Sequence, residues 1–117
     1  MDTQEAKPLM LGCTVISVHG TDLVLSNGMT LRCEVEGDCC SRSYFTEEDQ
    51  FKELEGAIIH DVEERHGKSH DGLNDAPDAD CTRWHFLVFT TNRGHVTIDW
   101  RNESNGYYDG TVFWTKP

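Results

Sequence analysis

Two adjacent cysteines are the residues whose type and position are best suited to chemistry. Cys39 and Cys40 lie in GDCCSRSYF, between a predicted strand and a predicted helix. A helix start and a nearby cation, here Arg42, would stabilise a thiolate and lower the pKa of the thiol. A thiol nucleophile also needs a base, for which His60 or His85 is a candidate, although no triad spacing is present. The simpler interpretation is that one cysteine packs inward and the other turns the chain.

A second segment, residues 100–110, gathers aromatic and polar side chains. Its sequence, WRNESNGYYDG, combines one tryptophan and two tyrosines with an arginine and two asparagines. Such a set can stack on a flat ring, anchor a protein partner or, through Arg101, hold an anionic group with two hydrogen bonds. The alternative is a tight turn at Asn105-Gly106 with the aromatic rings in the core. The ligand-binding residues predicted from both segments are Cys39, Cys40, Arg42, Tyr44, Arg101, Ser104, Asn105, Tyr107 and Tyr108.

The metal-ligating residues do not follow a familiar pattern. His66 and His70 have helical spacing, but a glycine separates them and the segment does not look helical. Paired C-x-x-C motifs, which are typical of zinc sites, are absent. The aspartates of residues 71–80 do not fit the twelve-residue calcium loop. The sequence therefore predicts no structural metal, and without a phosphate-binding glycine motif it predicts no cofactor either.

Charge limits the classes of partner. The chain has 10 lysines and arginines against 21 aspartates and glutamates, a formal net charge of −11. Such a surface repels phosphate backbones and anionic lipids, so we expect neither direct nucleic-acid binding nor membrane association. It favours a basic partner, and an acidic mimic of DNA is one special case. The oligomeric state is left open, so a homo-oligomer is compatible with the sequence.

Cysteine usage and the first residues indicate a reducing compartment. The five cysteines are odd in number and include one adjacent pair. The N-terminal residues MDTQEAKP are polar and acidic, unlike a signal peptide. We therefore expect reduced thiols and a cytoplasmic protein, rather than a disulfide framework.

The first third of the chain predicts a β-hairpin. Residues 1–8 read as a flexible tail before one domain of residues 9–117. β-Branched residues predict a strand over 11–18, and a second strand follows over 22–26. Asn27-Gly28 favours a two-residue type I′ turn into a third strand over 29–36. In that strand the alternation places Leu31, Cys33 and Val35 on one face.

The remaining elements predict an α+β fold. Thr46 is a candidate cap for a short helix that runs to Leu54, with Gly56 as its stop. A strand over 57–64 would place Ile58, His60 and Val62 on one face, and residues 65–80 read as a long exposed loop. Further strands are expected over 81–91, 95–101 and 107–114. The result is a mainly antiparallel sheet of about six or seven strands, with one short helix after the first hairpin group.

Two motifs in a fixed order resemble a known family. GDCCS at residues 37–41, followed by the aromatic pair at 44–45, and RNESNGYY at residues 101–108 resemble motifs of small bacteriophage-encoded proteins of unknown function. The resemblance extends from about Leu11 onward. Asp109 departs from the family pattern, where a second glycine is expected. The resemblance implies a phage-type protein in the host cytoplasm, and it carries no catalytic residue.

The functional expectation is binding rather than catalysis. The sequence, together with the resemblance, predicts a small non-enzymatic protein that interferes with a host process or defence by sequestering a host protein or a small signalling molecule. One alternative is a thiol-dependent or hydrolytic enzyme that uses Cys39 or Cys40 with a histidine. Another is an acidic DNA-mimic inhibitor or a virion-associated protein.

Overall fold

The computed structural model describes residues 1–37, 41–47, 49–66, 81–104 and 110–117. The mainly antiparallel β prediction is confirmed, with eight strands in two four-stranded sheets, one N-terminal helix and one 3₁₀ turn. The elements are α1 (Thr3–Met10), β1 (Val15–His19), β2 (Asp22–Leu25), β3 (Thr30–Gly37), β4 (Arg42–Phe45), η1 (Gln50–Leu54), β5 (Ile59–His66), β6 (Cys81–Thr91), β7 (Gly94–Ser104) and β8 (Gly110–Thr115).

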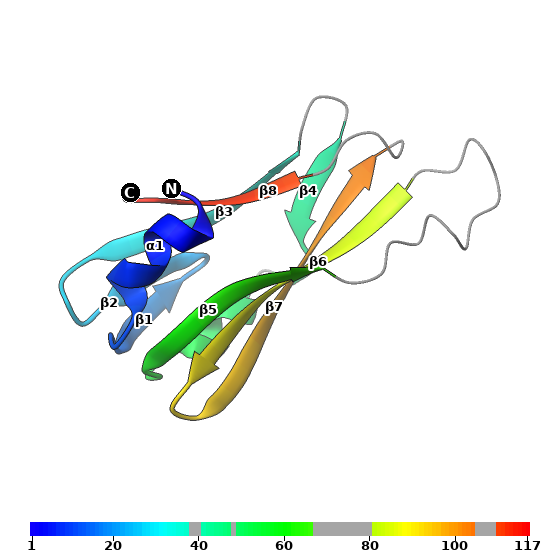
Figure 1. Cartoon of the computed structure of the whole chain (residues 1–117). Helices are drawn as coiled ribbons and strands as arrows, with labels where there is room; N and C mark the ends of the chain where they lie inside the picture. Colours follow the sequence, from blue (N-terminus) through cyan, green and yellow to red (C-terminus); the bar gives the residue numbers. More distant parts are fainter. Residues whose placement is uncertain (38–40, 48, 67–80, 105–109) are drawn as a thin grey trace.

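The chain crosses between the two sheets twice. The first sheet has the order β1-β2-β3-β8 and the second the order β4-β7-β6-β5, with every pairing antiparallel. The chain passes from the first sheet to the second after β3 and returns before β8. Both crossings lie at the same end of the molecule, because Gly37 pairs with Gly110 in one sheet and Arg42 with Glu103 in the other (Figure 1).

Glycine is required at this crossing because β4 passes very close to the first sheet. A Cβ atom on Gly37 would lie 2.6 Å from the Ser41 carbonyl oxygen, and one on Gly110 would overlap the Ser43 hydroxyl and lie 3.0 Å from the Glu36 carbonyl oxygen. Contacts this short are not tolerated between non-bonded atoms. The paired glycines therefore allow Ser41 and β4 to pass close to the last residue of β3 and the first residue of β8.

The first hairpin forms as predicted, with a different turn. β2 pairs with β3 in the register Leu23 to Leu31, and Leu31 and Cys33 point into the core. The Leu25 amide donates to the Met29 carbonyl oxygen and Gly28, with φ of 87°, donates to the Leu25 carbonyl oxygen. This is a three-residue loop that ends in a left-handed glycine, rather than the two-residue type I′ turn. Glycine at the last loop position supplies the required backbone conformation.

The face prediction for β5 is wrong because the strand contains a bulge. The register shifts between Ile59 and Asp61. An extra residue in one strand interrupts the alternation of side chains. As a result, Ile59 and Val62 are both buried, whereas His60 is exposed.

The N-terminal prediction of a flexible tail over residues 1–8 is also wrong, since Thr3–Met10 form α1. The Asp2 side chain accepts a hydrogen bond from the Glu5 amide, and the Glu5 side chain accepts one from the Asp2 amide. This reciprocal capping box satisfies two amides of the first turn. Ala6 and Met10 on one face of the helix are fully buried. Pro8 removes only one backbone donor from so short a helix.

The helix predicted from Thr46 is replaced by a shorter 3₁₀ turn. η1 begins at Gln50, because Thr46 continues along β7 and its amide donates to the Asp99 carbonyl oxygen. The predicted apolar edge is confirmed, as Phe51 and Leu54 are buried. The predicted stop is confirmed as well, since Gly56 follows the turn with φ of 85°.

η1 connects the two sheets through side chains that take the place of a strand partner. The Gln50 amide group donates to the Asp99 carbonyl oxygen at 2.9 Å and accepts from the Asp99 amide at 2.7 Å. On the other sheet, the Glu55 carboxylate accepts from the Val18 amide at 2.9 Å, and the Lys52 ammonium donates to the Val18 carbonyl oxygen at 2.7 Å. Each pair of bonds reproduces what a neighbouring strand would provide.

We therefore predict that Gln50→Leu destabilises the protein by about 1–3 kcal/mol. The variant keeps the side-chain size and removes both hydrogen bonds to the Asp99 backbone, together with the longer ones to Thr46 and Glu47. The Asp99 amide would lose its partner at the point where β4 no longer covers β7, and the Asp99 carbonyl oxygen would keep only its hydrogen bonds from Thr46. Urea unfolding monitored by circular dichroism would measure the change. Glu53→Gln on the same turn is the control, and an equal loss in both variants would contradict the role of the Gln50 amide.

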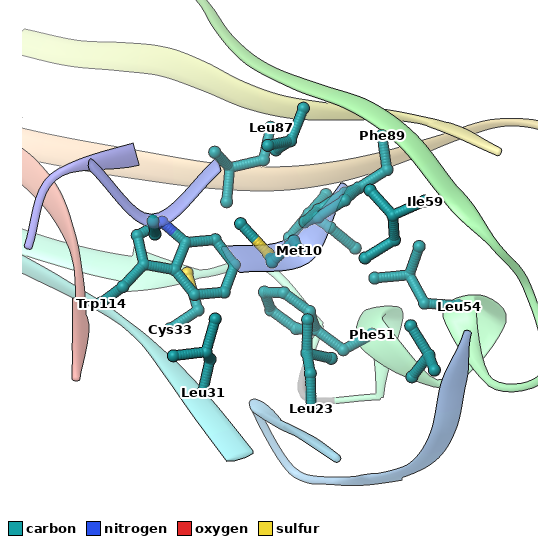
Figure 2. Close-up of a cluster of buried hydrophobic side chains, with 14 of the residues drawn as sticks. Met10, Leu23, Leu31, Cys33, Phe51, Leu54, Ile59, Leu87, Phe89 and Trp114 are labelled. Carbon is teal, nitrogen blue, oxygen red and sulfur yellow. The ribbon is translucent and has the colours of Figure 1, made fainter. Parts of the chain in front are cut away.

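The core lies between the two sheets and is closed at its sides by α1 and η1. Figure 2 shows Met10 of α1 at its centre, surrounded by side chains of both sheets and of η1. The largest buried side chains include Trp100, Trp114, Phe51 and Phe89. The Phe89 ring meets the Phe51 and Trp114 rings edge to face, each at a centroid distance of 6.4 Å. Such pairs add to the stabilisation by area burial.

Candidate functional site

The fold brings the two predicted segments together. β4, from the cysteine segment, pairs with the end of β7, from the aromatic segment, so that Tyr44 lies directly opposite Arg101 and Arg42 opposite Glu103. Three of the predicted site residues, Arg42, Tyr44 and Arg101, are therefore neighbours on one face of the second sheet. Cys39, Cys40, Asn105, Tyr107 and Tyr108 lie outside the described residues, as does the side chain of Ser104.

These three residues extend into a row across the outer face of the sheet. Arg101 also pairs with Trp84 of β6, and its guanidinium lies 4.7 Å from the centre of a Trp84 ring. The Arg42 guanidinium lies 5.0 Å from the centre of the Tyr44 ring. Arg42 is exposed and the other three are half-buried. Arg42, Tyr44, Arg101 and Trp84 are called the arginine–aromatic row below.

Acidic side chains orient the row. The Tyr44 hydroxyl donates to the Glu103 carboxylate at 2.8 Å, and this hydrogen bond, helped by partial burial, raises the pKa of Tyr44 above its ordinary value. A guanidinium nitrogen of Arg101 lies 3.5 Å from the Asp99 carboxylate. Within the described part of the chain, the buried Nε of Arg101 and the second carboxylate oxygen of Asp99 have no hydrogen-bond partner. Each such group costs about 1–3 kcal/mol when unsatisfied.

The opposite face of the same strands carries a buried polar side chain, Asn102. Asn102 is fully buried, and its amide donates to the Ser41 and Ser43 hydroxyl oxygens at 3.2 and 2.9 Å. Trp100 precedes it on β7 and is also buried. Because side chains alternate along a strand, burial of Trp100 and Asn102 places Arg101 and Glu103 on the outer face. The buried amide and hydroxyls hold β4 on β7 in the register that forms the row.

Two histidines meet on the inner face of the same sheet, where His85 directly follows Trp84 along β6. His66 of β5 pairs with His85 of β6, and their Nδ1 atoms are 2.5 Å apart. His85 is 3% exposed and stacks on Trp100, with ring centres 4.1 Å apart and an angle of 19° between the planes. His66 is exposed. Nothing in the sequence spacing, 19 residues, indicates this contact.

The described cysteines have structural positions. Cys33 is fully buried in the core, and burial raises the pKa of its thiol well above the ordinary value. A buried thiol of this kind is unreactive. Cys13 is half-buried, and its thiol lies 3.6 Å from the Leu9 carbonyl oxygen. Of the histidines considered as bases for the thiol enzyme, His60 is exposed and His85 is buried against His66.

The described ranges contain no group of three or more histidine, cysteine, aspartate or glutamate side chains placed to hold a metal ion. They also contain no helix long and apolar enough to cross a membrane.

A hollow of about 380 Å³ beside η1 is lined by Glu47, Asp49, Gln50, Lys52, Glu53 and Thr97. It contains none of the predicted site residues.

Comparison with known proteins places the chain in a family. Residues 8–114 match a domain of unknown function, DUF7448, which covers most of the chain. The protein belongs to the DUF7448 family. No curated protein and no solved structure matches it. The arginine–aromatic row therefore lies within the DUF7448 domain, as do His66 and His85.

Sequence reasoning missed three residues of this DUF7448 site. The contact of Trp84 with Arg101 depends on the β6–β7 register, which the local sequence does not contain. Glu103 contacts Tyr44 and Asp99 contacts Arg101, but neither acidic residue could be singled out from the sequence, because the chain has 21 of them. The pairing of strands is the information that would have identified all three.

Proposed function

We propose that this protein is a non-enzymatic binding protein whose arginine–aromatic row is the docking surface for a protein partner. One observation carries the proposal. Two aromatic rings and two guanidinium groups lie side by side across β4, β7 and β6 on the outer face, where Arg101 contacts Trp84 and Arg42 contacts Tyr44. Tryptophan, tyrosine and arginine are the residues most enriched among those that dominate binding energy at protein interfaces.

The rigidity of the row supports this function. Asn102 and the two serines fix β4 on β7 from the inside, and Glu103 and Asp99 restrain Tyr44 and Arg101 from the outside. Side chains that are already ordered lose little conformational entropy when a partner binds. This property favours tight binding for a small contact area.

Charge narrows the class of partner. The two arginines of the row are balanced by Asp99 and Glu103, so the row itself is close to neutral. The rest of the surface is acidic, given the net charge of −11. Opposite charges around an interface speed association and exclude wrong partners. We infer a partner whose contact surface is apolar and surrounded by lysine and arginine.

The resemblance of GDCCS and RNESNGYY to motifs of phage-encoded proteins suggests where that partner is found. The proposal in its specific form is that the protein acts in the cytoplasm of an infected host and sequesters a host protein. Its support is the motif pair, whose flanking strands β4 and β7 form the row.

The test compares partner binding by row variants and by a matched control. We predict that Arg101→Ala and Trp84→Ala each weaken binding of the partner about tenfold to a hundredfold, as expected for residues at the centre of an interface. Arg65→Ala is the control, because Arg65 is an exposed arginine of the same sheet, outside the row. Proteins retained from host lysate by the wild type and by Arg65→Ala, but not by the row variants, would be purified and titrated by calorimetry.

Folding must be separated from binding in this test. Circular dichroism and thermal unfolding of each variant would show that the fold is intact, as expected for half-buried outer-face residues. A purified partner that binds Arg101→Ala and Trp84→Ala as tightly as the wild type would refute the proposed surface. Equal loss in Arg65→Ala would point to general charge attraction and would also refute it.

A further inference from the structure

The two histidines where the last residue of β5 meets β6 form an arrangement that the arginine–aromatic row does not use. His66 and His85 are direct cross-strand partners, and their rings meet at 89° with centres 4.6 Å apart. Both Nδ1 atoms point to the same small volume and are 2.5 Å from one another. Two neutral imidazoles at this distance must share one proton, with one nitrogen donating and the other accepting.

The surroundings fix one ring and leave the other adjustable. His85 is buried and stacked on Trp100, which holds the plane of its imidazole. His66 is exposed and lies at the last residue of β5, so its side chain can shift without disturbing the core. A pair of ligands in which one side chain is held in place and the other can move can bind an ion with little rearrangement of the fold.

We propose that His66 and His85 form a two-histidine site for a divalent transition metal ion, Zn²⁺ or Cu²⁺, whose remaining positions are filled by water. Imidazole nitrogen is a preferred ligand of both ions. A metal–nitrogen distance of about 2.0–2.1 Å with tetrahedral angles places two ligand nitrogens about 3.3 Å apart. The Nδ1 atoms, now 2.5 Å apart, need to separate by only about 0.8 Å. The ion takes the place of the proton between the two Nδ1 atoms, and the ring that gave up this proton takes one from solvent at its Nε2, so that each imidazole stays neutral. Water reaches the ion from the exposed His66 side.

Zinc and copper titrations of the full chain test the site. The protein would be made with a cleaved, histidine-free tag and stripped of metal before calorimetry with Zn²⁺ at pH 7.5. We expect one equivalent to bind, and a rise in melting temperature because the ion binds the folded state. His66→Ala should weaken the affinity at least tenfold, or about 1.4 kcal/mol. His60→Ala, an exposed histidine of the same strand, should bind as the wild type does.

Copper provides a readout that counts the ligands. Electron paramagnetic resonance of the Cu²⁺ complex should show hyperfine splitting from two imidazole nitrogens in the wild type and from one in His66→Ala. Binding that is absent, or that is unchanged in His66→Ala, would overturn the proposal. Since His66 is exposed, that variant decides the question even if His85→Gln proves unstable.

Discussion

Replacing Trp114 with alanine should destabilise the protein by about 3–5 kcal/mol, the largest effect expected of any single substitution here. Trp114 is fully buried between the two sheets, and its ring packs edge to face on Phe89. Truncation leaves a cavity that the rigid β-sheets cannot close. It also removes the Trp114 indole N–H, which donates a hydrogen bond to the Thr3 hydroxyl oxygen at 3.1 Å. Much of this small domain's stability would be lost.

Two further variants make that result interpretable. Trp114→Phe keeps most of the buried ring and removes the hydrogen bond, so it should cost about 1–3 kcal/mol. Trp84→Ala removes a tryptophan that is half-buried on the outer face, and we expect a smaller loss of stability with a larger loss of binding. Chemical unfolding would measure all three. Similar losses for Trp84→Ala and Trp114→Ala would contradict the assignment of one to the surface and the other to the core.

Gly110→Ala should destabilise the protein by about 2–4 kcal/mol, through crowding at the crossing of the sheets. The new methyl group would overlap the Ser43 hydroxyl and come within 3.0 Å of the Trp100 ring. Ser43 would have to rotate away from Asn102, whose buried amide would lose its 2.9 Å hydrogen bond. The register of β4 on β7 depends on that bond, so binding through the row should weaken as well.

A double-mutant cycle identifies the cause. Ser43→Ala removes the hydroxyl that the new methyl group would strike, so the double variant Gly110→Ala, Ser43→Ala should lose clearly less stability than the sum of the single variants. Urea unfolding of the four proteins gives the coupling energy. Strictly additive losses would show that the methyl group introduced at position 110 and the Ser43 hydroxyl do not interact.

Local sequence signals predicted the strands well and their details less well. Alternation placed Leu31 and Cys33 in the core correctly, but Asn27-Gly28 suggested a turn one residue too short. α1 was missed because residues 1–8 are mostly polar, although Asp2 and Glu5 have the spacing of a capping box. The bulge at β5 and the late start of η1 depend on contacts with β6 and β7, which no local pattern contains.

The candidate site was predictable in composition and not in arrangement. Arg42, Tyr44 and Arg101 were chosen for their chemistry, and the β4–β7 pairing makes them neighbours. Trp84 and the histidine pair come from β5 and β6, which are distant in sequence from both motifs. Only the register of the sheet joins them, and register is set by the burial of Trp100, Asn102 and the other inner residues as a group.

The side chains of η1 have a consequence for how copies of this protein behave toward one another. A bare strand edge is a template on which the next molecule can add a strand, which is the first step toward fibrils. The Gln50 side chain hydrogen-bonds the β7 backbone at Asp99, just beyond the end of β4. The Lys52 and Glu55 side chains hydrogen-bond the β1 backbone at Val18. Three polar side chains, two on η1 and one on the residue that follows it, thus occupy backbone groups of both sheets that another molecule could otherwise bind. At Asp99 and Val18 these edges therefore offer no vacant backbone groups on which a second molecule could add a strand.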